Sequence, residues 1–196
     1  MNRTLILLLL VAGFFSCSLL QNNHILYREG KRLPDSTYVY ALPFAIGKSY
    51  RVVQGSHSFF SHYGDFAIDF QMKPGTPIHA ARDGVVTYAR DHFDGGGITR
   101  KYVGKGNGLT IRHADGTYSH YWHLRYQGAV VRIGDTVKKQ QLIGYSGSTG
   151  FSAFPHLHFE VTRNARIGRE EVPVVFDTEE GARFLQPLRR YKAVSE

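Results

Sequence analysis

The feature that most constrains this chain is the eight-residue stretch Phe154–Val161, with the sequence FPHLHFEV. Apolar residues alternate here with His156, His158 and Glu160, which predicts a β-strand. Because successive side chains on a strand point to opposite faces, the two histidines share one face and the apolar residues occupy the other. Two imidazoles on one rigid strand can converge on one point, as a metal ligand and its catalytic neighbour must. An ordinary half-buried strand with histidines on its polar face would have the same spacing. The rest of the chain must therefore distinguish a functional site from such a strand.

The composition is that of a globular protein. The chain has 196 residues, of which 42% are hydrophobic and 20% are charged, enough for one domain with a core and short extensions. Its 21 glycines, 13 phenylalanines and 12 tyrosines indicate short aromatic-rich strands separated by turns. The net charge of +8 favours an anionic partner, such as nucleic acid, a membrane surface or a cell-wall polymer, without selecting one.

The N-terminus indicates export. Residues Met1–Arg3 carry a positive charge and Thr4–Phe15 form an apolar run that is too short to span a bilayer, as in a secretory signal. This argues against a nucleic-acid-binding role. The single cysteine, Cys17, follows directly and resembles the lipidated cysteine of a bacterial lipoprotein signal, although Phe14 replaces the usual leucine. Lipidation, simple secretion and an uncleaved anchor all remain open, and one cysteine excludes an intrachain disulfide.

Short strands and turns dominate the rest of the chain. We predict an edge strand in Tyr38–Pro43, a strand at Gly84–Ala89, a hairpin of Leu109–His113 and Thr117–Leu124, a mobile loop over Asp91–Gly108, and at most a short helix within Glu179–Tyr191. The predicted fold class is therefore mainly β: a compact, twisted antiparallel sheet with a groove, one wall of which is the Asp91–Gly108 loop.

Three further segments carry candidate functional residues. The first, SHYGDFAIDF at 61–70, contains a histidine and two aspartates that a distant histidine could complete as a catalytic zinc site with three protein ligands. The second contains His120 and His123, which are three apart and should face opposite ways on a regular strand. The third, GYSGSTG at 144–150, offers hydroxyl and backbone N–H groups just before the histidine-bearing strand.

Taken in order, several motifs resemble one known family. They are Asp69-Phe70, Pro74-Gly75-Thr76-Pro77-Ile78, Asp83-Gly84-Val85-Val86, Tyr121-Trp122-His123-Leu124, Gly144-Tyr145-Ser146-Gly147-Ser148-Thr149-Gly150 and Pro155-His156-Leu157-His158-Phe159. Each motif alone is weak, but the ordered set, spread over residues 50–162, resembles the LytM/lysostaphin-type zinc metalloendopeptidases. These enzymes cut peptide cross-links in bacterial peptidoglycan.

The resemblance implies a Zn²⁺ site formed by a histidine, an aspartate and the second histidine of the HxH motif. The last two fall on Asp69 and His158. In the commonest family spacing the first ligand lies four residues before the aspartate, but Asp65 occupies that position here. We therefore expect His62, seven residues before Asp69, to be the first ligand; Asp65 and His57 are the alternatives.

The family's two catalytic histidines that do not bind zinc map to His123 and His156. We expect one to take a proton from the attacking water and the other to stabilise the oxyanion, without assigning which does which. His120 has no counterpart in the motif and is expected to pack or to support a ligand. Tyr145 and Thr149 could line the groove.

The other basic residues are expected to lie at the surface. These are His79, His92 and His113, together with Arg183, Arg189, Arg190 and Lys192 of the C-terminal segment, where a solvated face is more common than a wall-binding patch.

The resemblance also implies an organisation of the chain. We expect a signal at 1–17, an N-terminal extension at 18–48, a zinc metallopeptidase domain at 49–165 and a C-terminal tail at 166–196. The expected function is that of an exported, zinc-dependent endopeptidase of the cell envelope, anchored to a membrane if Cys17 is lipidated. The alternative is an inactive scaffold of the same family that binds the cell wall or activates amidases.

Overall fold

The computed structural model describes residues 38–55 and 66–195. Within these ranges the chain forms β-strands and one short 3₁₀ helix, and no α-helix. The elements are β1 (Val39–Tyr40), β2 (Ser49–Gln54), β3 (Ile68–Gln71), β4 (Pro77–His79), β5 (Gly84–Arg90), β6 (Gly96–Gly97), η1 (Arg100–Tyr102), β7 (Asn107–Arg112), β8 (Tyr118–Ala129), β9 (Thr136–Val137), β10 (Leu142–Ser146), β11 (Gly150–Phe151), β12 (His156–Thr162), β13 (Val175–Phe176) and β14 (Arg190–Lys192).

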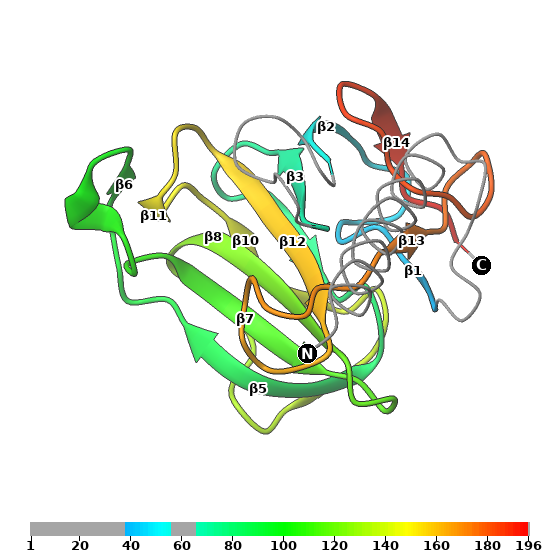
Figure 1. Ribbon diagram of the computed structural model, residues 1–196, viewed down its shortest axis with the longest axis horizontal. Coiled ribbons are helices and arrows are strands. Elements are labelled where there is room, and N and C mark those ends of the chain that lie inside the picture. The colour runs from blue at the N-terminus through cyan, green and yellow to red at the C-terminus, as the bar shows by residue number, and fades with distance from the viewer. Residues whose placement is uncertain (1–37, 56–65, 196) are drawn as a thin grey trace, which may run out of the picture.

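Ten of these strands form one twisted antiparallel sheet (Figure 1). Its main path runs β14-β2-β3-β12-β8-β7-β5-β9, and β10 joins it by pairing with β8 and β4. The strand predicted in Phe154–Val161 is β12, which begins two residues later and lies between β3 and β8, and the predicted hairpin is β7 and β8. These observations confirm the predicted fold class.

The core covers one face of this sheet. Directly paired residues on β3, β12, β8 and β7 form a row of fully buried side chains, which are Ile68, Phe159, Tyr121 and Leu109. The Phe159 ring lies 5.2 Å from that of Tyr121 and 5.5 Å from that of Phe176, measured between centroids. The apolar face that alternation predicts for β12 therefore packs into the core, and the opposite face is left for the histidines.

Replacing Phe159 with alanine is expected to lower the free energy of unfolding by about 3–5 kcal/mol, because it opens a cavity at the centre of the aromatic cluster. The matched control is Phe151→Ala, at a ring that is 54% exposed, with an expected change within about 0.5 kcal/mol. Urea unfolding of the two variants measures both values. Similar destabilisation by the two substitutions would contradict this description of the core.

Residues from both ends of the described chain also belong to the core. β1 pairs with β13 in a separate two-stranded sheet, and β14 extends the main sheet beyond β2; Phe44, Phe176 and Tyr191 are buried. The division of the chain at residues 48 and 165 stays a prediction. No helix in the described ranges is long and apolar enough to cross a membrane.

The helix predicted within Glu179–Tyr191 is wrong. This segment contains turns and the start of β14. Gly181 adopts a positive φ of 87°, and the Thr178 hydroxyl donates a hydrogen bond to the Gly181 carbonyl, an arrangement typical of a tight turn. Pro187 follows six residues later and removes a backbone donor that a helix would need.

The segment between β5 and β7, predicted as a loop, is fastened at two points. The side-chain amide of Asn107 donates to the Phe93 carbonyl and its oxygen accepts the Phe93 N–H. Gly96 pairs with Gly150, and a Cβ added at Gly96 would lie only 1.7 Å from the Ser148 carbonyl oxygen. Only glycine therefore allows β6 to lie this close to the segment that precedes β12.

Candidate active site

The site is built on a row of residues that runs across the sheet, on the face opposite the core. Gln54 on β2 pairs with Asp69 on β3, Asp69 with His158 on β12, and His158 with Trp122 on β8. Residues that pair directly point to the same face of a sheet. Asp69 and His158, which are 89 positions apart in the sequence, are therefore brought together by strand register.

Asp69 and His158 lie in the geometry of two ligands of one metal ion. His158 Nδ1 lies 3.0 Å from Asp69 Oδ1, and both side chains are largely buried. Two ligands that each bind tetrahedral zinc at about 2.1 Å are separated by about 3.4 Å. Imidazole nitrogen and carboxylate oxygen are also ligands that zinc accepts, so this pair fits the predicted cofactor.

The electrostatics favour a cation at this position. Burial by itself lowers the pKa of His158, but Asp69 and Glu160 outweigh it and raise the pKa to about 10. Two nearly buried carboxylates therefore stabilise positive charge at the His158 ring. The same carboxylates would stabilise a divalent cation bound between Asp69 and His158.

Glu160 supports His158 from its other side, a role that the sequence analysis missed. Its side chain is 2% exposed; Oε2 lies 3.8 Å from His158 Nε2, while Oε1 accepts the Gly168 N–H at 2.8 Å. A carboxylate beside the second ring nitrogen of a ligating histidine typically fixes its tautomer and orientation. The alternation along β12 was the available signal, because it places Glu160 on the same face as His158.

The two predicted catalytic histidines lie beside this pair. The His123 and His156 rings are 4.5 Å apart between centroids, and His123 is 6.1 Å from His158. Each is oriented by a backbone carbonyl: His123 Nδ1 donates to Thr149 and His156 Nδ1 donates to Phe154. In the neutral rings this tautomer leaves Nε2 as the acceptor. His156 Nε2 lies 3.8 Å from Asp69 Oδ1, so it faces the site.

Burial keeps both rings neutral near pH 7. It lowers the pKa of His123 to about 3, with the neighbouring His156 and His158 adding to the effect. It also lowers the pKa of His156, although Asp69 opposes the shift. A neutral imidazole with an available Nε2 is a suitable proton acceptor.

A β-bulge explains why His123 reaches the site. On β7 the neighbours Asn107 and Gly108 pair with Leu124 and Trp122, so His123 is the extra residue on β8. Its φ of 66° is unusual for a residue other than glycine, and bulges re-aim side chains in this way. The prediction that His120 and His123 face opposite ways assumed a regular strand and fails here, because both line the same cavity.

His120 has the packing role that was expected. Its Nδ1 lies 3.0 Å from the Thr110 hydroxyl and its Nε2 lies 2.9 Å from the Thr162 hydroxyl, and the ring is 1% exposed. Both ring nitrogens are therefore occupied, which leaves none for chemistry. Thr149 orients His123 through its carbonyl, and Tyr145 lies beneath the Arg125 guanidinium, 4.8 Å from its ring centroid.

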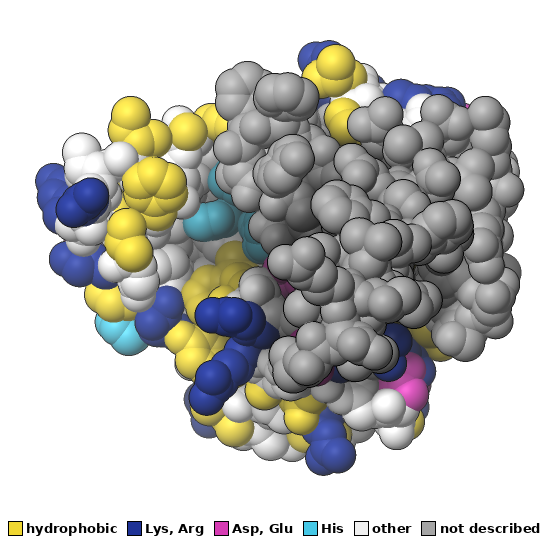
Figure 2. Space-filling view, in the orientation of Figure 1, with side chains coloured by type: hydrophobic (Ala, Val, Ile, Leu, Met, Phe, Trp, Pro, Cys, Tyr) yellow, Lys and Arg dark blue, Asp and Glu magenta, His cyan; other side chains and the backbone are white. Residues whose placement is uncertain are grey.

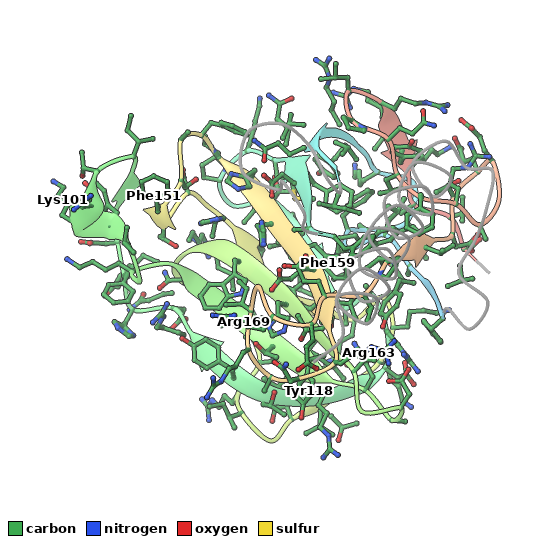
Figure 3. The ribbon with its side chains drawn as sticks, viewed as in Figure 1. Lys101, Tyr118, Phe151, Phe159, Arg163 and Arg169 are labelled. Atoms are coloured by element: carbon green, nitrogen blue, oxygen red, sulfur yellow. The ribbon has the colours of Figure 1, made fainter. Side chains whose placement is uncertain are left out.

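The site lies where two cavities adjoin. They have volumes of about 730 and 780 Å³, and both are lined by His123, Phe151, His158 and Ile167. Ile98, Gly104 and Gly106 also line them, which confirms that the Asp91–Gly108 loop forms a wall of the groove. Figure 2 shows histidine side chains in this hollow, bordered by hydrophobic side chains; Phe151 lies at its β11 end (Figure 3).

The surface predictions for the remaining histidines hold in part. His92 is exposed and His79 is half-buried. His113 is 2% exposed, so its prediction is wrong: its Nδ1 donates to the Asp83 carbonyl, and burial lowers its pKa to about 4. The Tyr40 ring packs against His113, with 5.8 Å between the two ring centroids. This contact joins segments that are distant in the sequence, so the local sequence does not predict it.

The first predicted zinc ligand, His62, and its alternatives His57 and Asp65 lie outside the described residues. Within residues 38–55 and 66–195, no group of three or more His, Cys, Asp or Glu side chains could by itself hold a metal ion. Of the three predicted zinc ligands, Asp69 and His158 lie within the described residues. The three-ligand set therefore stays a prediction, as do the roles of His123 and His156.

Replacing Glu160 with glutamine is expected to weaken zinc binding by about 10- to 100-fold, the usual cost of losing a partner of a ligating histidine. Glutamine keeps the size of the side chain but lacks the negative charge that faces His158. Competition with a zinc-chelating dye measures the affinity. Glu170→Gln, at an exposed carboxylate, is the control and should leave the affinity unchanged; an unchanged affinity for Glu160→Gln would exclude the supporting role.

The amino-acid sequence is similar to those of known endopeptidases. The chain is 39% identical over 105 residues to the glycyl-glycine endopeptidase ALE-1 of Staphylococcus capitis, covering 54% of this chain and 25% of that protein. It is 37% identical over 98 residues to the peptidoglycan DD-endopeptidase ShyA of Vibrio cholerae, covering 50% of this chain and 20% of that protein. The matched region thus spans about a quarter or less of each relative.

Solved structures show the same fold. The structure of lysostaphin from Staphylococcus simulans superimposes with a TM-score of 0.51 at 31% identity, covering 63% of this chain and 47% of that one. Residues 62–169, more than half of the chain, match the model of peptidase family M23. The chain therefore belongs to peptidase family M23.

Proposed function

We propose that this protein is an exported, zinc-dependent endopeptidase that hydrolyses peptide cross-links of bacterial peptidoglycan. The observation that carries the proposal is the convergence of Asp69, His158, His123 and His156 in one groove. A ligand pair lies beside two neutral histidines, which are the groups that hydrolysis of an amide by an activated water requires. The relative ShyA, which is named a peptidoglycan DD-endopeptidase, supports the choice of substrate.

Asp69, His158 and His62 would hold the zinc ion. When bound, zinc makes a water molecule more acidic and polarises the carbonyl of the bond to be cut. Glu160 would keep the His158 ring in the orientation that presents Nδ1 toward Asp69, because its Oε2 lies beside Nε2. The second ring nitrogen is thereby directed toward the Glu160 carboxylate.

His123 and His156 would handle the protons. The Thr149 and Phe154 carbonyls hold each ring with Nδ1 protonated and Nε2 as acceptor. One Nε2 takes a proton from the attacking water and later passes it to the leaving amine. The other ring would stabilise the oxyanion that forms at the carbonyl in its protonated form, with a second proton taken up from solvent at Nε2, because its Nδ1–H already donates to a backbone carbonyl. Burial keeps bulk water from competing for these bonds.

The groove is suited to an extended peptide. Its two halves meet at the site, so a chain can pass through with residues bound on both sides of the cut bond. The apolar run before Cys17 would direct the protein to the cell envelope, where such a substrate lies, and lipidation of Cys17 would anchor it there. Whether it is anchored or secreted, the proposed substrate is the same.

The test is incubation of the mature protein with purified peptidoglycan, followed by mass spectrometry of the released muropeptides and metal analysis of the protein. We expect one zinc ion per chain and release of cut cross-links that stops when zinc is chelated and resumes when it is restored. A metal-free protein that binds peptidoglycan without releasing fragments would overturn the proposal in favour of the inactive scaffold.

A further inference from the structure

The two halves of the groove differ in charge. The cavity toward β5 is lined by Arg90 and Arg166 and by no described aspartate or glutamate. The cavity toward β2 is lined by Asp69, Glu160 and Glu171 and by no described lysine or arginine. Lys and Arg side chains are visible along one edge of the hollow (Figure 2). A bound peptide therefore meets two arginines on the β5 side of the site, whereas two of the three carboxylates on the β2 side, Asp69 and Glu160, belong to the predicted metal site.

Arg90 is held in place with no acidic partner among the described residues. Its Nε and Nη2 donate to the Gly106 carbonyl at 2.9 and 2.5 Å, and its guanidinium carbon lies 5.2 to 5.7 Å from the ring centroids of Phe93, Trp122 and Tyr88. The side chain is half-buried, and no ion pair joins it to any carboxylate in the described residues. Within the described residues, the Arg90 guanidinium is therefore stabilised by a carbonyl and by aromatic rings rather than by a carboxylate. Because Arg90 is already ordered, an incoming carboxylate would meet little ordering cost.

Strand register places Arg90 in line with the site. Arg90 pairs with Gly108 on β7, Gly108 with Trp122 on β8, and Trp122 with His158 on β12. Gly108 leaves room for the indole, since a Cβ there would lie 2.7 Å from Trp122 Cδ2. Three strand spacings of about 4.8 Å place the Arg90 backbone about 14 Å from that of His158, the length of roughly four residues of extended peptide.

Arg166 is a second arginine that lines this cavity. It lies on the loop after β12, residues 163–172, which crosses in front of β7 and β8 (Figure 1) and carries Arg163 and Arg169 (Figure 3). Ala165, Arg166 and Ile167 of this loop line the same cavity as Arg90. The Arg166 side chain is exposed and forms no ion pair within the described part of the chain.

We propose that this half of the groove is a carboxylate-binding subsite in which Arg90, assisted by Arg166, binds a free carboxylate of the substrate within about four residues of the cut bond. The inference rests on the proposed function and narrows its substrate class. Peptide stems that are linked directly carry free carboxylates, whereas a bridge of glycines carries none between its ends. The relatives include both a glycyl-glycine endopeptidase and a DD-endopeptidase at similar identity, so the comparison alone does not choose between them.

The experiment compares two synthetic cross-linked peptides that are identical except that the stem carboxylates are free in one and amidated in the other. The full mature chain, loaded with zinc, is expected to cleave the carboxylate form with a kcat/KM about 10- to 100-fold higher, the usual effect of a charge-assisted hydrogen bond. Arg90→Gln should bring the ratio of the two rates close to one. The control Arg132→Gln, at an exposed arginine outside the groove, should keep the ratio of the wild type.

The ratio within each variant does not depend on how much of that variant folds, which separates loss of recognition from loss of stability. Equal cleavage of the two peptides by the wild type, or an unchanged ratio in Arg90→Gln, would overturn the subsite. Arg90→Lys is expected to keep only part of the preference, because lysine retains the charge but not the fork of donors.

A binding measurement keeps this inference separate from the proposed function. Trp122 is the only tryptophan of the chain and lines this cavity, so its fluorescence reports on occupancy. If neither peptide is cleaved, the proposed function fails, and titration with the same two peptides decides the subsite. Tighter binding of the carboxylate form, lost in Arg90→Gln, supports it; equal binding of the two forms overturns it.

Discussion

Replacing His158 with alanine is expected to abolish both zinc binding and hydrolysis of peptidoglycan. The substitution removes the Nδ1 that lies 3.0 Å from Asp69 Oδ1, and it leaves the buried carboxylates of Asp69 and Glu160 without the group between them. The loss in zinc affinity should exceed the roughly 10- to 100-fold that follows the loss of a supporting partner. Metal analysis of the purified protein and release of muropeptides measure the two effects.

The control for this variant is His92→Ala, which removes an imidazole that is exposed and is not one of the predicted zinc ligands. It should retain zinc and activity. Because β12 is central to the sheet, the circular dichroism spectrum of each variant must match that of the wild type before the metal contents are compared. A folded His158→Ala protein that keeps stoichiometric zinc and cleaves peptidoglycan would exclude His158 as a ligand.

Replacing His123 with asparagine is expected to lower kcat by about 10²- to 10⁴-fold, the usual contribution of a general acid or base, and to leave the zinc content unchanged. Asparagine is chosen because His123 has a φ of 66°, and asparagine tolerates that conformation better than most residues. The variant thus loses the imidazole without adding backbone strain at the bulge. Steady-state kinetics on a soluble cross-linked peptide, together with metal analysis, provide the two measurements.

The zinc content and kcat of His123→Asn together distinguish a proton-transfer residue from a zinc ligand. Unchanged zinc with a large fall in kcat is expected if His123 transfers a proton and is not a ligand. Loss of zinc in His123→Asn would instead place this ring among the ligands, and an unchanged kcat would exclude it from proton transfer. His120→Gln, at a neighbouring histidine whose nitrogens are both occupied by threonine hydroxyls, should change stability more than kcat.

Local periodicity predicts part of this molecule well. The alternation in β12 predicts both its strand and its histidine face, because the period of two is a property of every strand. The turn Ala114-Asp115-Gly116 predicts the β7–β8 hairpin in the same way. The pairing of Asp69 with His158 required the family resemblance, since no local pattern gives the register between distant strands.

The errors arise where the local pattern is broken or where distant segments meet. His123 reaches the site through a β-bulge, which shifts the alternation by one residue. His113 is buried because Tyr40 and the turn at Asp83 cover it, and both contacts depend on the tertiary fold. The alternation places Glu160 on the same face as His158, but it does not give the distance between the two side chains. The supporting role of Glu160 could therefore be assigned only from the structure.

The most direct test of this account is a crystal structure of the zinc-loaded mature protein, with the metal located from its anomalous scattering. The account predicts one zinc ion at the junction of the two cavities, about 2.0–2.2 Å from an Asp69 oxygen, from His158 Nδ1 and from a nitrogen of His62. A protein that takes up no zinc, or a metal bound away from Asp69 and His158, would contradict it.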